Sequence, residues 1–245
     1  TLPDKIASSE MYKITNLKIT GEINGTDWKM IREMAGSNYK GEPTEGKLSV
    51  LDLSEARIVN GGGEYYCYGY NCYTSNDVIG EYAFKGCSGL TSLNLPAGIT
   101  EIGNGAFCGC SGLTSLNLPA GITSIGSYAF EGCKRLTSLN LPAGITVIDD
   151  NAFYGCSGLT SLTLPASITR IGGSHAFQGC SGLTSIYVCA EKVPEIGSSA
   201  FWGFDAKKCT LYVPMGTYDD YRLSKFGYFE NIVEFDATGI DKTTT

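Results

Sequence analysis

The chain has one histidine, His175, among its 245 residues, which excludes any metal site built from two histidines. No apolar run approaches the roughly 18 residues of a membrane-spanning helix, so we expect no membrane insertion. Clusters of lysine and arginine are also missing, and the formal net charge is −7 with a sequence pI near 4.8. An acidic chain without a basic patch is a poor partner for nucleic acid and for anionic membrane surfaces.

Glycine, by contrast, is abundant: 32 of 245 residues, or about 13%, against a usual share of about 7%. Many of these glycines belong to a recurring phrase in which Ala-Phe is followed by one variable residue and then Gly-Cys. Self-similarity at a fixed period is the signature of a repeat architecture. Successive copies are 23 or 24 residues apart, and their phenylalanines are Phe84, Phe107, Phe130, Phe153, Phe177 and, in a degenerate copy, Phe201.

Each repeat has the pattern expected for one short coil of a solenoid. Leu93 and Leu95 alternate with polar residues, which predicts a strand whose leucines point inward. Ile99 and Ile102 predict a second short extended stretch on another face, and Phe84 lies in a predicted tight helical or 3₁₀ turn. Strands one repeat apart would form a parallel sheet, with each coil stabilised by packing on its neighbours.

The flanking segments differ from the repeats and are predicted to close the two ends. On the N-terminal side we expect a strand over Ile14–Ile23 and a helix over Asp27–Ala35 that Thr26 caps. On the C-terminal side Thr217 and Asp220 resemble a capping box that starts a short helix. The predicted segments are an N-terminal cap at 1–47, the solenoid at 48–205, a C-terminal capping repeat at 206–235 and a flexible tail at 236–245.

The repeat phrase IGxxAFxGCSGLTSLxLPxxIT resembles the BspA-like leucine-rich repeats of exported proteins from Bacteroides-type bacteria. The segments ITGEINGTDWKMIREMAG and TLYVPMGTYDDY resemble the lead-in and the closure of the same family. The resemblance implies a leucine-rich-repeat solenoid, export to the cell envelope or cell surface, and binding to a protein or a host surface. It implies no catalytic residues, and it does not identify the ligand.

The ten cysteines include a periodic set and a pair outside the repeats. Cys67 and Cys72 lie in an insert, where an oxidising compartment would allow them to close a small loop; the sequence leaves this open. The periodic set occupies one repeat position, which we interpret as a column of small, buried, unpaired hydrophobic residues: Cys87, Cys110, Cys133, Cys156 and Cys180.

Catalytic residues are not indicated. His175 occupies a repeat position that elsewhere holds Tyr, Asn or Ser, which we interpret as a surface slot that tolerates varied residues rather than the place of a general base. The outward strand positions of the repeats include no acid, which argues against the facing carboxylates of a glycosidase. We therefore expect no enzyme, no cofactor and no metal site.

Two surfaces are candidates for binding. The first is the outward strip of Ser, Asn and Thr along the strands, including Asn94, Asn117 and Asn140; the alternative is an ordinary solvated sheet face. The second is an insert at 59–78 that mixes tyrosine with Gly, Ser and Asn, as antibody paratopes do; the alternative is a loop that covers the first repeat. The tyrosines of this insert are Tyr65, Tyr66, Tyr68, Tyr70 and Tyr73.

These features predict a monomeric, adhesin-like recognition module, exported to the cell envelope or cell surface, that binds a host protein or glycan. The alternative prediction is a structural spacer or scaffold within a larger envelope protein. A saturable interaction on a protein or glycan array distinguishes the two.

Overall fold

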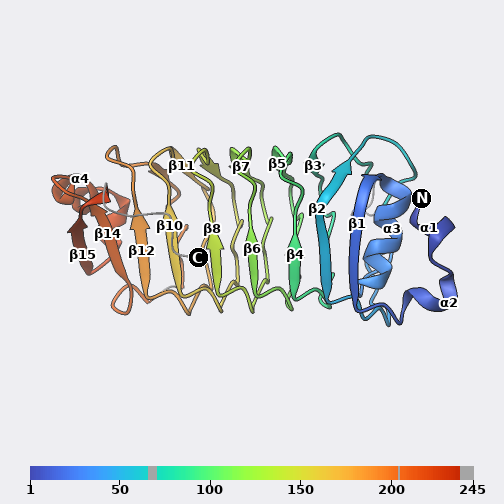
Figure 1. Ribbon diagram of the computed structural model, residues 1–245. Helices are drawn as coiled ribbons and strands as arrows, with labels where there is room; N and C mark the ends of the chain where they lie inside the picture. Colours follow the sequence, from blue (N-terminus) through green and yellow to red (C-terminus); the bar gives the residue numbers. More distant parts are fainter. Residues whose placement is uncertain (66–70, 204, 238–245) are drawn as a thin grey trace.

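The computed structural model describes residues 1–65, 71–203 and 205–237. The chain forms an elongated solenoid whose coils follow one another along one axis (Figure 1), so the predicted solenoid of stacked coils with parallel strands is confirmed. A front row of parallel strands faces the viewer: β1 Asn16–Ile23, β2 Val50–Ile58, β4 Ser92–Asn94, β6 Ser115–Asn117, β8 Ser138–Asn140, β10 Ser161–Leu164, β12 Ser185–Val188, β14 Thr210–Pro214 and β15 Asn231–Phe235.

A second row of parallel strands runs along the upper edge of Figure 1 and forms one six-stranded sheet. Its in-register isoleucines, such as Ile125 and Ile148, are fully buried, as the repeat pattern predicts. This second row contains β3 Val78–Ile79, β5 Glu101–Ile102, β7 Ser124–Ile125, β9 Val147–Ile148, β11 Arg170–Ile171 and β13 Glu195–Ile196.

The turns between the two rows are lined by a continuous stack of phenylalanine rings. From Phe84 to Phe201, successive ring centroids are 5.2 to 5.4 Å apart and the ring planes differ by 3 to 12°. Around each ring the backbone forms consecutive tight turns with bonds between residues three apart, such as Cys133 N to Phe130 O at 3.1 Å. Of the two predicted alternatives, a helical or a 3₁₀ turn, the structure has the 3₁₀ type of bond. The stack places the largest apolar side chain of every repeat in the core.

The residue two positions before each phenylalanine from Phe84 to Phe177 lies in a restricted backbone conformation. The φ angle is 53° at Tyr82, 59° at Tyr128 and 52° at His175, all in the left-handed region. Our interpretation of this slot as freely tolerant is therefore wrong, because a side chain in that region costs roughly 1–2 kcal/mol unless glycine or asparagine occupies it. Gly105 and Asn151 occupy the same slot without that cost.

The cysteine column is confirmed as buried and unpaired. All five of its members are free thiols with almost no exposed surface. Each thiol from Cys110 onward donates to the backbone carbonyl of a phenylalanine in the preceding coil, as in Cys133 Sγ to Phe107 O at 3.2 Å and Cys156 Sγ to Phe130 O at 3.1 Å. The column thus links adjacent coils through S–H donors as well as filling space.

Alkaline solution should weaken the fold through these thiols. Burial raises the pKa of Cys87 to about 11 and also raises that of Cys110. An unfolded thiol, with a pKa of about 8.5, ionises first, so the stabilisation is complete below about pH 8.5 and is lost as the pH rises toward 11. We expect the column to resist alkylation at pH 8 in the native protein and to react fully in denaturant, as mass spectrometry would record. Rapid native alkylation at Cys133 would contradict this expectation.

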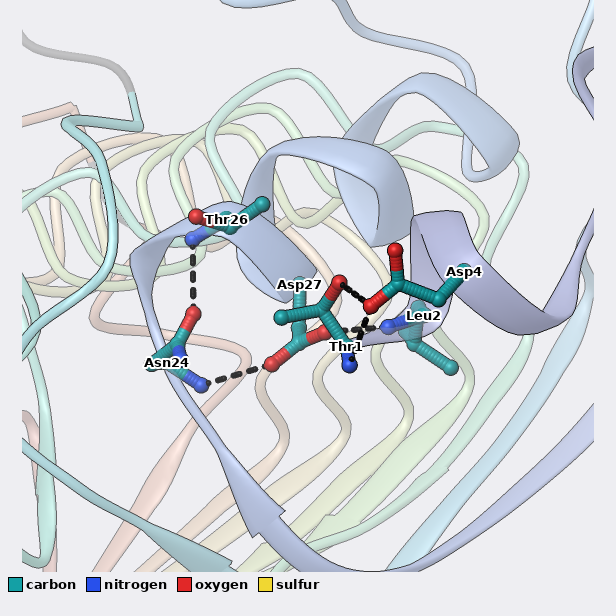
Figure 2. A network of polar contacts seen from close by, with 6 residues as sticks. All are labelled: Thr1, Leu2, Asp4, Asn24, Thr26 and Asp27. Carbon is teal, nitrogen blue, oxygen red and sulfur yellow. Dashed lines mark hydrogen bonds and ion pairs between the residues drawn. The ribbon is translucent and has the colours of Figure 1, made fainter.

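The N-terminal segment contains three helices: α1 Leu2–Lys5, α2 Ser8–Met11 and α3 Gly25–Met34. Helix α3 begins earlier than predicted, because Asn24 and not Thr26 is its N-cap residue. Figure 2 shows the reason: Asn24 Oδ1 accepts from Thr26 N (3.0 Å), and the Asp27 carboxylate accepts from Asn24 N (3.0 Å). The same carboxylate accepts from the amide of Leu2, which joins α1 to the start of α3.

Helix α3 also satisfies backbone groups of the first coil. In the turns, amides of one coil donate to carbonyls of the next, as in Phe84 N to Ala106 O at 2.7 Å. No earlier Ala-Phe turn precedes the first coil, so its equivalent carbonyls need other donors. The buried Arg32 donates to the carbonyls of Ala83 and Lys85, both at 2.9 Å, and the indole of Trp28 donates to Ala83 O at 2.9 Å.

The C-terminal segment contains α4 Tyr218–Leu223 and the 3₁₀ helix η1 Lys225–Tyr228, followed by β15, which pairs with β14 as a further strand of the front row. The expected capping box of Thr217 and Asp220 is wrong. The Thr217 hydroxyl donates to Pro214 O at 2.7 Å, and the amide of Tyr218 donates instead to the Glu234 carboxylate at 2.9 Å.

The division into segments at 47, 205 and 235 stays a prediction, and most of the expected tail, residues 238–245, lies outside the described residues.

Candidate functional site

The outward side chains of the front row form a column in register, which we call the front strip. Its central members, Asn94, Asn117 and Asn140, are exposed, while the leucines that precede them point into the core. The alternation of the strand produces this arrangement, because successive side chains point to opposite faces. From β1 to β15 the front strip consists of Lys18, Asp52, Asn94, Asn117, Asn140, Thr163, Tyr187, Tyr212 and Val233.

Charge is confined to the N-terminal end of the front strip. Lys18 forms ion pairs with Glu55 and, at 3.8 Å, with Asp52. Hydrogen bonding to Glu55 raises the pKa of Lys18, and hydrogen bonding to Ser54 lowers that of Asp52. The members of the strip beyond Asp52 are Asn, Thr, Tyr and Val, so this part of the strip is electrically neutral.

The C-terminal end of the front strip is aromatic, a feature that our reading of the sequence missed. Tyr187 and Tyr212 stack with ring centroids 4.3 Å apart and planes 6° apart. The ring of Phe235 is nearly perpendicular to that of Tyr187, with centroids 5.5 Å apart and planes at 85°. Burial and the neighbouring Tyr212 raise the pKa of Tyr187. The signal was present, since Ser-Ile-Tyr-Val at 185–188 replaces the Ser-Leu-Asn-Leu of earlier repeats.

The structure divides the tyrosines of the insert. Tyr65 is 3% exposed, and its hydroxyl donates to Glu81 O at 3.0 Å, the third carbonyl that the first coil leaves without a donor from a preceding turn. Its assignment to a ligand-binding surface is therefore wrong, because the ring packs beside Trp28 in the core. Tyr73 is 55% exposed and stays a candidate.

The remaining predicted residues of the insert, Tyr66, Tyr68 and Tyr70, lie outside the described residues. Cys72 is disulfide-bonded, whereas Cys67 lies in the same undescribed stretch. The start of the insert is held against α3, since Gly25 N donates to Gly61 O at 3.0 Å and Gly63 N donates to the Thr26 hydroxyl at 3.1 Å. Residues 61–63 of the insert are therefore bonded to the start of α3.

A hollow of about 510 Å³ lies where the second row meets the C-terminal helices. Its charged lining residues include Arg170, Glu195 and Lys225. Arg170 forms an ion pair with Asp149, and Lys225 donates to the carbonyl of Ile196 at 2.8 Å. Because Arg170 and Lys225 already have partners and the lining contains both cationic and anionic side chains, the hollow does not favour one class of ligand.

Within residues 1–65, 71–203 and 205–237, no three metal-binding side chains lie together, and no helix is long and apolar enough to cross a membrane. His175 has its Nδ1 buried without a hydrogen-bond partner, while the Cys180 thiol donates to Phe153 O at 3.1 Å. The structure thus does not bring these two side chains together as a nucleophile and its base.

The fold and the repeat chemistry define a leucine-rich-repeat solenoid. A family model described as the BspA type leucine rich repeat region matches six copies over residues 77–208, more than half of the chain. The chain belongs to this family. Comparison with curated proteins found no match.

Solved structures of bacterial leucine-rich repeat proteins resemble the chain. One from Bacteroides ovatus is 21% identical over 79% of this chain and 45% of that chain, with a TM-score of 0.50. A T. pallidum leucine-rich repeat protein is 33% identical over 50% and 55% of the two chains, with a TM-score of 0.44. A leucine-rich cell surface protein of Faecalibacterium prausnitzii is 24% identical over 74% and 49%, with a TM-score of 0.48. The chain spans about half the length of these structures, and the likeness to the Bacteroides ovatus protein concerns the fold.

Proposed function

We propose that this chain is a non-catalytic recognition module, adhesin-like, that binds a protein or a glycan at a host or cell surface. The observation that supports this most directly is the neutral part of the front strip, from Asn94 to Tyr212. It is exposed or half-buried along its length, and the helices of the described residues lie at the two ends of the solenoid and not over it (Figure 1). Side-chain amides and hydroxyls there provide both donors and acceptors.

Export to the cell envelope or cell surface is part of the proposal. It is supported by membership of the BspA-type family and by the Faecalibacterium prausnitzii structure, which is described as a cell surface protein. The exposed Tyr73 would extend the recognition surface at the N-terminal end, since tyrosine is enriched among residues that dominate binding. We propose that the module acts as a monomer.

The alternative, a structural spacer, is favoured by the uniformity of the central repeats. Strands β4, β6 and β8 present the same Ser-Leu-Asn sequence. The hydroxyls of the repeat threonines donate to backbone carbonyls of the preceding coil, as in Thr114 Oγ1 to Thr91 O at 3.1 Å. A uniform surface whose hydroxyls already have internal partners is compatible with a spacer.

Arrays of host proteins and glycans test the two functions. A recognition module should show saturable binding, and a spacer should bind nothing on either array. For a ligand found in this way, replacing Asn94, Asn117 and Asn140 together by alanine should weaken binding at least tenfold, about 1.4 kcal/mol. The paired change Lys134→Ala with Arg135→Ala, at exposed positions outside the front strip, is the control and should leave affinity unchanged.

The insert is tested separately with the double variant Tyr66→Ala and Tyr70→Ala. If the insert contributes to recognition, this variant should also weaken binding at least tenfold, about 1.4 kcal/mol, while the melting temperature changes little. A large fall in melting temperature with unchanged affinity would instead assign these tyrosines to the first repeat and leave recognition to the front strip.

A further inference from the structure

We infer that the aromatic end of the front strip is a binding site for a neutral oligosaccharide, with one sugar ring stacked on Tyr187. This inference rests on the proposed recognition function and names its ligand class. It depends on three observations: an aromatic face that the neighbouring side chain is too short to cover, a rigid support behind that face, and an uncharged polar floor in front of it.

The open aromatic face follows from the register of the strands. Tyr187 of β12 lies between Tyr212 of β14 and Thr163 of β10. Because the two tyrosine rings are stacked nearly parallel, one face of Tyr187 is covered by Tyr212 and the opposite face is directed toward β10. The side chain of Thr163 is exposed and much shorter than a tyrosine, so it cannot cover that face.

The support behind the ring holds it in position. Tyr212 lies flat against Tyr187 with ring centroids 4.3 Å apart. The ring of Phe235 is nearly perpendicular to both, and its centroid lies 5.5 Å from that of Tyr187 and 6.4 Å from that of Tyr212. Phe235 is itself held by the pairing of β15 with β14, where it lies opposite Pro214. A ring held in this way loses little conformational freedom when a ligand binds.

The floor in front of the ring consists of short polar side chains. Thr163, Asn140 and Asn117 follow one another along the front strip at strand spacing, about 4.8 Å per coil. An asparagine side chain donates two hydrogen bonds and accepts at its carbonyl oxygen, and a threonine hydroxyl both donates and accepts. Such a floor suits neighbouring hydroxyl groups on the edge of a sugar.

The absence of charge selects the class of ligand. From Asn94 to Tyr212 the front strip has no carboxylate or cationic side chain, and its ion pairs lie at the other end, at Lys18. Anionic glycans and nucleic acids would find no cation there, and the chain itself carries a net charge of −7. A neutral sugar combines an apolar C–H face, which the electron-rich face of Tyr187 attracts, with hydroxyls for the polar floor.

The test uses the whole chain on an array that holds neutral, sialylated and sulfated glycans, followed by calorimetric titration with the best neutral oligosaccharide. We expect neutral glycans to bind and Tyr187→Ala to weaken binding at least tenfold. Tyr187→Phe should retain binding within about twofold, because stacking requires the ring and not the hydroxyl. Proton NMR should show upfield shifts of sugar C–H resonances with the wild-type chain and with Tyr187→Phe.

The matched control is Tyr128→Ala, at a tyrosine that is 43% exposed in a turn outside the front strip and that should not affect affinity. If Tyr187→Ala lowers the melting temperature substantially, Asn140→Ala replaces it and should also weaken binding. Binding to sialylated or sulfated glycans alone, or unchanged affinity in Tyr187→Ala, would overturn the inference. If a host protein binds the front strip and no neutral glycan does, the oligosaccharide site is wrong and the proposed recognition function stands. If neither a protein nor a glycan binds, the recognition function and the oligosaccharide site are both wrong.

Discussion

Replacing Phe130 by alanine should lower the free energy of unfolding by about 3–5 kcal/mol. The ring is fully buried, with the rings of Phe107 and Phe153 at 5.2 and 5.3 Å on its two sides. Its removal leaves a cavity in the middle of the stack that neither neighbour can close, because each is held by its own coil. Urea or thermal unfolding followed by circular dichroism measures the change.

The control for this prediction is Asn140→Ala, on the exposed face of β8. It should change stability by no more than about 0.5 kcal/mol, since no buried group loses a contact. Equal losses at the two positions would contradict the register in which phenylalanine points inward and asparagine outward.

Replacing Arg32 by leucine should destabilise the N-terminal end of the solenoid by at least about 2 kcal/mol. The guanidinium is fully buried and donates to the carbonyls of Tyr82 and Lys85 and to the buried Ser37 hydroxyl. Leucine removes all three bonds: Lys85 O loses this donor, whereas Tyr82 O keeps only the bond from Lys85 N. Each buried polar group without a partner costs about 1–3 kcal/mol. Leucine keeps much of the apolar volume, so the loss reports on hydrogen bonding more than on packing.

Hydrogen exchange locates this effect. In Arg32→Leu the amides of α3 and of the first coil should exchange faster, while those of the distant coils around Phe177 should change little, because each coil contacts only its neighbours. Arg135→Leu, at an exposed arginine in a later repeat, is the control and should stay within about 0.5 kcal/mol. Uniformly faster exchange along the whole chain would contradict a local role for Arg32.

Much of the solenoid could be predicted because the same short pattern of apolar and polar residues recurs in every coil. A period of 23 or 24 residues, with Leu, Ile and Phe at constant positions, specifies which side chains of every coil point inward. The same regularity predicted the buried, unpaired cysteines and the exposed Asn94, Asn117 and Asn140. Translation by one coil brings equivalent residues together, so a single repeat describes its neighbours.

The ends of the molecule and the aromatic end of the front strip were decided by tertiary structure. Tyr65 belongs to a loop by composition, yet its hydroxyl is buried because the first coil needs a donor for Glu81 O. Tyr187, Tyr212 and Phe235 are far apart in the sequence and meet only because β12, β14 and β15 are adjacent. The repeat pattern therefore determined the fold and its exposed amides by itself. Contacts between segments that share no pattern determined how the first coil is closed and how Phe235 of β15 comes to lie against the stacked tyrosines.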